Sequence, residues 1–121
     1  MENIEKIIQE INDEIQKYRF NLYNEKELQE QLHSVVLSKL GFLREYKLDS
    51  KSIIDFYNKE NKIGIEIKIK GQVTSIFRQC KRYAKKDEIE YLVLITSIAM
   101  NLPKEIEGKK TFILRISNSW L

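Results

Sequence analysis

Apolar residues near the start of the chain recur at the spacing of one helix face. From Ile4 onward the intervals between apolar positions are 4, 3, 4, 3 and 4 residues, which predicts an amphipathic helix with Asn3 as its N-cap. The members of this stripe are Ile4, Ile8, Ile11, Ile15, Tyr18 and Leu22. Two uses of the stripe stay open: packing on the helix's own domain, or pairing with a second copy of the chain in a homodimer.

A second helix is predicted from Asn24 to Leu40. Asn24 is followed three residues later by a glutamate, which is a capping-box pattern, and Gly41 is a favoured residue just past a helix end. The centre of the apolar stripe on this helix passes close to Glu25 and Gln29. A carboxylate at the edge of a buried face needs a physical reason, so Glu25 is a candidate functional residue.

The remainder of the chain reads as strands around a third helix. The expected strands are Phe42–Leu48, Ser52–Tyr57, Lys62–Lys70, Tyr91–Thr96 and Thr111–Ser117, and the expected helix is Gln72–Lys86. The third strand is the clearest, because isoleucine occupies every second position from Ile63 to Ile69. This order predicts an α/β fold with a central mixed β-sheet flanked by helices and a right-handed crossover through the third helix. The N-terminal amphipathic helix, residues 1–22, is an addition to the main domain, residues 23–121.

Composition narrows the chemistry that this domain can perform. The 121 residues include one Cys and one His, which excludes an internal disulfide, a Cys-based or His-paired zinc site and most Ser-His-Asp machinery. His33 and Cys80 are expected to be structural, and Trp120 is expected to pack or to anchor an interface. The lone Cys and an acidic N-terminus without a signal-peptide layout favour a cytoplasmic protein, and no apolar run is long enough to span a membrane.

The net charge of +3 conceals a strongly uneven distribution. Residues 1–30 contain four basic and eight acidic side chains, whereas residues 62–86 contain eight basic side chains and one acidic one. The second segment, with a net charge of +7, could face a polyanion, or it could be a solvated helix face with one ion pair.

The single acid in that basic segment belongs to a recognisable constellation. Glu66 and Lys68 lie on one face of a strand, about 7 Å apart along it, and Asp55 lies on the preceding strand across a tight turn. Two adjacent carboxylates repel each other, and a divalent cation with a preference for oxygen ligands relieves that repulsion. A neighbouring lysine can orient a water or stabilise charge on a phosphoryl group.

These residues resemble the PD-(D/E)XK nuclease superfamily. The chain reads Ile54-Asp55 and then Glu66-Ile67-Lys68, and the stretch Gln79-Cys80-Lys81-Arg82-Tyr83 is similar to the Gln-x-x-x-Tyr motif of the RecB-like branch. Ile54 stands where the family motif has proline. The resemblance covers roughly residues 24–97 and implies a restriction-endonuclease-like core within residues 23–121.

The resemblance implies a metal-dependent DNA nuclease that hydrolyses phosphodiester bonds with Mg²⁺ or Mn²⁺. The implied metal ligands are Glu25, Asp55, Glu66 and the backbone carbonyl of Ile67. Lys68 would position the attacking water, and Gln79 and Tyr83 would orient the site or the phosphate. The residues expected to contact DNA phosphates are Lys70, Arg78, Lys81, Arg82, Lys85 and Lys86.

Two other functions stay open at this point. One is a catalytically inactive module that keeps the nuclease fold for DNA binding or assembly. The other is a dimeric resolvase of branched DNA, such as a Holliday junction, with the first helix as the dimer interface. The small size of the chain also suggests structure-selective cutting, or a protein partner that supplies targeting.

Overall fold

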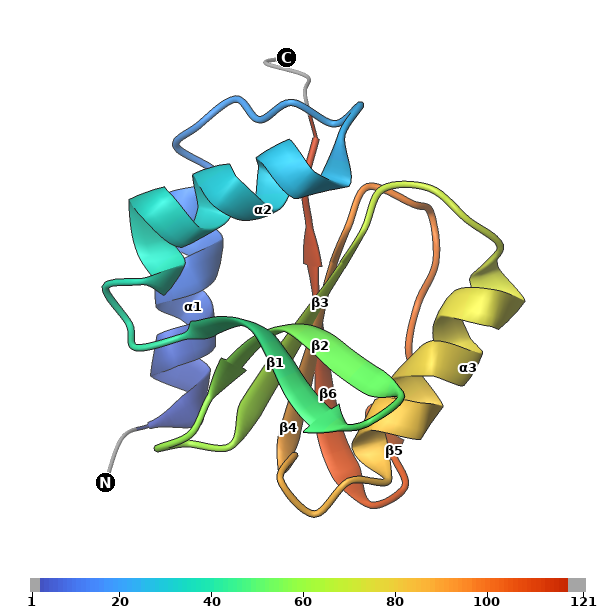
Figure 1. The fold of residues 1–121 in the computed structure, drawn as a ribbon. Helices are drawn as coiled ribbons and strands as arrows, with labels where there is room; N and C mark the ends of the chain where they lie inside the picture. Colours follow the sequence, from blue (N-terminus) through green and yellow to red (C-terminus); the bar gives the residue numbers. More distant parts are fainter. Residues whose placement is uncertain (1–2, 118–121) are drawn as a thin grey trace.

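The computed structural model describes residues 3–117, and Trp120 lies outside this range. The chain forms an α/β fold in which a six-stranded mixed sheet is flanked by three helices. Figure 1 shows the sheet between α1 and α2 on one side and α3 on the other. None of the helices in residues 3–117 is long and apolar enough to cross a membrane.

The sheet begins as an antiparallel meander and continues with parallel strands. The meander consists of β1 (Leu43–Asp49), β2 (Ser52–Asn58) and β3 (Ile63–Lys68). The chain then crosses through α3 (Val73–Ala84) to β4 (Tyr91–Thr96), which pairs in parallel with β3. The predicted mixed sheet and crossover helix are therefore confirmed.

The C-terminal part of the sheet differs from the prediction. The last strand, β6 (Lys109–Arg115), starts and ends two residues earlier than expected and pairs in parallel with β4. It is preceded by a two-residue strand, β5 (Glu105–Ile106), which the sequence pattern did not indicate. So short a strand carries no detectable alternation. The full strand order is β1-β2-β3-β4-β6-β5.

The first helix, α1 (Ile4–Ile15), is shorter than predicted but uses the predicted face. Asn3 caps it by accepting a hydrogen bond from the Lys6 backbone N–H at 3.3 Å. The predicted extension to residue 22 is wrong, because the chain leaves the helix after Ile15 and Tyr18 is 46% exposed. The apolar stripe within α1 is buried inside this chain, so a homodimer stays a prediction that would need another surface.

The second helix changes its winding part-way along. It runs as α2 (Glu25–Leu32) and continues as the π-helical turn η1 (His33–Leu37). Asn24 caps α2, accepting hydrogen bonds from the backbone N–H groups of the second and third helical residues. Together α1, α2 and η1 cover one face of the sheet, and α3 covers the other. His33 stacks on Phe56, consistent with the structural role expected for it.

The sequence pattern suggested one apolar and one polar face for β3. The structure buries both, because β3 has a strand on each side and helices above and below. Gly64 is enclosed so closely that a Cβ atom there would lie 2.6 Å from the side-chain methyls of Ile54 and Ile89. Glu66, two residues further on, is only 3% exposed.

Candidate functional site

The candidate site forms where β2 and β3 stop pairing. The regular ladder joins Asn58 to Ile63 and ends at the pair Phe56 and Ile65. Beyond that point side chains replace the backbone ladder. The Asp55 backbone N–H donates to Glu66 Oε1 at 3.3 Å, and the Ile67 backbone N–H donates to Asp55 Oδ2 at 2.8 Å. Each carboxylate therefore receives a backbone N–H from the opposite strand.

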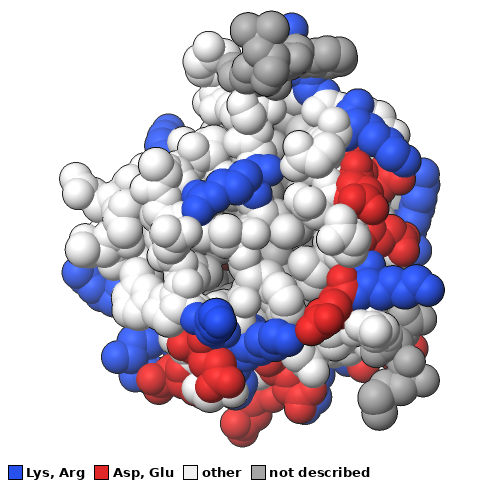
Figure 2. All heavy atoms as spheres, turned by 180° about the vertical axis from the view of Figure 1, so that it is seen from behind, with Lys and Arg blue, Asp and Glu red and all other residues white. Residues whose placement is uncertain are grey.

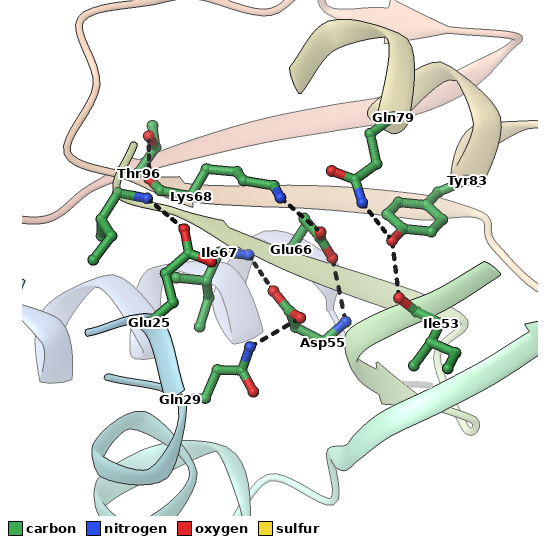
Figure 3. A network of polar contacts seen from close by, with 11 residues as sticks. Glu25, Gln29, Ile53, Asp55, Glu66, Ile67, Lys68, Gln79, Tyr83 and Thr96 are labelled. Atoms are coloured by element: carbon green, nitrogen blue, oxygen red, sulfur yellow. Dashed lines mark hydrogen bonds and ion pairs between the residues drawn. The ribbon is translucent and has the colours of Figure 1, made fainter. Parts of the chain in front are cut away.

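Lys68 joins this pair from the end of β3. Its Nζ lies 3.8 Å from Glu66 Oε2, and its side chain is 24% exposed, whereas the Glu66 side chain is almost fully buried. The expectation that Asp55, Glu66 and Lys68 would meet is confirmed, as Figure 3 shows. Lys68 also forms part of the connection to β4, because the Thr96 hydroxyl donates to the Lys68 carbonyl at 2.6 Å.

Burial dominates the electrostatics of the two carboxyl groups. It raises the pKa of Glu66 to about 9, with the neighbouring Asp55 as the next cause, and the charge of Lys68 offsets only part of this rise. Burial also raises the pKa of Asp55, while the Ile67 N–H and Lys68 act in the opposite direction. Both carboxyl groups therefore resist ionisation more than exposed ones do, although Lys68 offsets part of this effect.

Gln29 is a member of the site that sequence reasoning did not select. Its Nε2 donates to Asp55 Oδ1 at 3.0 Å, and the residue is 5% exposed. A signal was present, since Gln29 lies near the centre of the apolar stripe of its helix. A polar residue there needs a buried partner, and Asp55 supplies it.

Glu25 lies close to the carboxyl pair but has a partner of its own. Its Oε1 accepts a hydrogen bond from the Ile69 backbone N–H at 3.0 Å, just past the end of β3. Within residues 3–117 no group of three or more His, Cys, Asp or Glu side chains is arranged to hold a metal ion. The structure thus joins Asp55 and Glu66 directly and places Glu25 at the rim (Figure 3).

Gln79 and Tyr83 face the site from α3, but their polar atoms are engaged in anchoring the helix. The Tyr83 hydroxyl donates to the Ile53 carbonyl at 2.9 Å, and Gln79 Nε2 donates to the Tyr83 hydroxyl at 3.0 Å. Burial raises the pKa of Tyr83, with the charge of Glu66 as the next cause. These two residues therefore tie α3 to β2 beside Glu66. Cys80, on the same helix, is fully buried, as expected of a core residue.

Of the residues predicted to contact DNA phosphates, most are exposed and one forms an ion pair within the protein. The exposed ones are Lys70, Arg78, Lys81, Arg82 and Lys85. Lys86 is half-buried and forms an ion pair with Asp49, so it is less available to a ligand. Arg78 and Lys81 line an open cavity of about 470 Å³ together with Phe77 and Asn101.

Charge is distributed unevenly over the surface. Figure 2 shows the face opposite to the view of Figure 1, where the centre carries few charged side chains. Basic and acidic side chains gather together along its lower and right margins. This face is therefore not a uniformly basic surface.

We found no match to this chain among protein-family models, curated proteins or solved structures.

Proposed function

We propose that this protein is a metal-dependent nuclease that hydrolyses phosphodiester bonds in DNA. The observation that carries the proposal is the carboxylate pair of half-buried Asp55 and buried Glu66, with Lys68 beside it, at the point where β2 and β3 diverge. The α3 helix with Gln79 and Tyr83 lies next to this group, as the resemblance to PD-(D/E)XK nucleases implies.

The chemistry of the carboxyl pair suits a divalent cation. Asp55 and Glu66 supply hard oxygen ligands, and the pKa of each is raised despite the nearby charge of Lys68. We propose that they would hold Mg²⁺ or Mn²⁺, with the Ile67 carbonyl and Glu25 as the remaining protein ligands. A bound cation of this kind supplies charge neutralisation at the phosphoryl oxygens and lowers the pKa of a bound water. Glu25 would join only by giving up the Ile69 N–H.

Lys68 has the placement that water positioning requires. Its ammonium group is held near Glu66 and still reaches solvent. From there it can hold the attacking water by its lone pair and stabilise charge on the phosphoryl oxygens. Water attack on phosphorus then breaks the bond to the leaving oxygen, which takes up a proton. The exposed cations of α3 would hold the DNA backbone without reading its sequence.

The experiment is a cleavage assay with labelled single-stranded, duplex and branched DNA. We expect cutting with Mg²⁺ or Mn²⁺ and none with EDTA, and we expect Lys68→Ala to lower the rate at least a hundredfold without loss of folding. Lys47→Ala is the matched control, since Lys47 is an exposed lysine on β1, and it should cut at the normal rate. Metal-independent cutting, or no cutting of any of the three forms at high enzyme concentration, would overturn the proposal.

A second candidate is a non-catalytic module that binds DNA through the same fold. The observation that favours it is the engagement of Glu25 by Ile69, which leaves two carboxylates together and no third within the described residues. This candidate predicts salt-dependent DNA binding without cleavage, and an Asp55→Ala variant that functions normally. Cleavage of branched DNA specifically would instead favour a resolvase, which acts as a dimer.

A further inference from the structure

Two side-chain atoms near the site are buried and have no hydrogen-bond partner among the described residues. One is Gln29 Oε1, an acceptor, and the other is Arg44 Nε, a donor. A buried polar group without a partner is costly, and such groups are uncommon in native structures. One of these atoms is a donor and the other an acceptor, so each has the chemistry that the other lacks.

The Arg44 side chain reaches the part of α2 that carries Gln29. Arg44 pairs with Phe56 across β1 and β2, and cross-strand partners project from the same face of a sheet. Phe56 belongs to the core that α1 and α2 cover, so Arg44 also lies on that face. Its Nη2 donates to the Lys26 carbonyl at 3.5 Å, and Lys26 precedes Gln29 by about one helical turn.

The orientation of the Gln29 amide is already determined by Asp55. Nε2 donates to Asp55 Oδ1, so Oε1 must be the atom directed elsewhere. Figure 3 shows this oxygen directed away from the carboxyl pair. Arginine has donors only and keeps its charge throughout the accessible pH range. It can therefore pair with the oxygen of the Gln29 amide but not with its nitrogen.

We propose that Arg44, Gln29 and Asp55 form a relay that positions the Asp55 carboxylate. In this relay Arg44 Nε–H donates to Gln29 Oε1 through one buried water, and Gln29 Nε2–H donates to Asp55 Oδ1. Arg44 and Gln29 are positioning residues, because they act on the site through Asp55. The relay as a structural unit stands alone, whereas its role in holding a cation rests on the proposed function.

The structural part is tested without metal by a double-mutant cycle. Gln29→Met and Arg44→Met are made singly and together, and the unfolding equilibrium constant of each variant is measured with urea. If the two side chains are coupled, the second substitution costs less than it does alone. We therefore expect the unfolding equilibrium constant of the double variant to be about tenfold smaller than the two single effects together predict. Pairing Arg44→Met with Gln31→Met, an exposed position on the same helix, should show no such coupling. A coupling below twofold for Arg44 and Gln29 would overturn the relay. If Arg44→Met does not fold, Arg44→Lys removes Nε and keeps the charge, and the same coupling is expected.

The role of the relay in metal binding is tested by a Mn²⁺ titration that is monitored by electron paramagnetic resonance. We expect Gln29→Met and Arg44→Lys each to weaken Mn²⁺ binding at least tenfold, while both variants remain folded as judged by circular dichroism. Normal Mn²⁺ affinity in both variants would overturn the positioning role. An unaltered protein that binds no Mn²⁺ would overturn the proposed function, and the metal-free coupling would still decide the relay.

Discussion

Glu66 is the residue at which stability and the proposed chemistry oppose each other most directly. It is 3% exposed, lies beside a second carboxyl group, and has a lysine at 3.8 Å as its nearest positive charge. Burial of a charge without full compensation costs free energy. The fold accepts this cost at one position, which is typical of a functional site.

We predict that Glu66→Gln stabilises the metal-free protein. The folded-state pKa of Glu66, about 9, lies above its ordinary value of 4.5, so the folded protein loses stability as the pH rises from 4.5 towards 9. Glutamine has the same shape and does not titrate. The increase in the free energy of unfolding should be negligible below pH 4.5 and should reach about 1–3 kcal/mol at pH 7. Urea unfolding at a series of pH values measures it.

Glu10→Gln is the matched control for that measurement. Glu10 is exposed on α1, and its replacement should leave the pH dependence of unfolding unchanged. A Glu66→Gln variant less stable than the unaltered protein at pH 7 would contradict this account of the site. Excess Mg²⁺ should stabilise the unaltered protein and should have no effect on Glu66→Gln.

The main residues of the site were predictable from the sequence, but their surroundings were not. Asp55 and Glu66 were brought together by the length of the turn between two strands, which is local information. Gln29 and Arg44 come from a helix and an outer strand, and their relation to Asp55 depends on how α2 packs on the sheet. No local pattern encodes that packing.

At the scale of elements, β3 sets the position of the site. It carries both Glu66 and Lys68, and it is held between β2 and β4. Gly64 allows Ile54 and Ile89 to close over the strand. The packing around this glycine therefore leaves no room for a side chain at position 64.

We predict that Gly64→Ala destabilises the protein by about 1–3 kcal/mol, because the new methyl group would overlap the methyls of Ile54 and Ile89. Thermal unfolding measures the loss. Adding Ile89→Val removes one of the two clashing methyls, so the double variant should be more stable than the sum of the single losses predicts. Strict additivity would show that the clash is not the cause.

The elements themselves were predictable to different degrees. Alternation identified β3, and the spacing of apolar residues identified α3, because each pattern is long enough to be distinctive. The end of α1 at Ile15 and the π-turn η1 were not predicted, since the apolar spacing continues through both points. In η1, Val36 and Leu37 pack into the core shared with α1 and the sheet, which no local pattern indicates.

For the whole molecule, the fold gathers its charges into a distinct arrangement. Buried Glu66 and half-buried Asp55 lie on central strands of the sheet, and a group of exposed cations lies along α3. The overall mixed sheet followed from the order of the elements. The burial of both faces of β3 did not, because it depends on which strands flank it, and strand order is a global property.

The measurement that tests the central claim most directly is a crystal structure of the protein grown with Mn²⁺, with anomalous difference density used to locate the ion. We predict one strong peak between Asp55 and Glu66, with carboxylate oxygens at about 2.1 Å and Lys68 still beside Glu66. Crystals of the Glu66→Gln variant soaked in Mn²⁺ should show no peak at this position. A map at saturating Mn²⁺ with no peak at these residues, or with the ion bound elsewhere and this pair unchanged, would contradict the account.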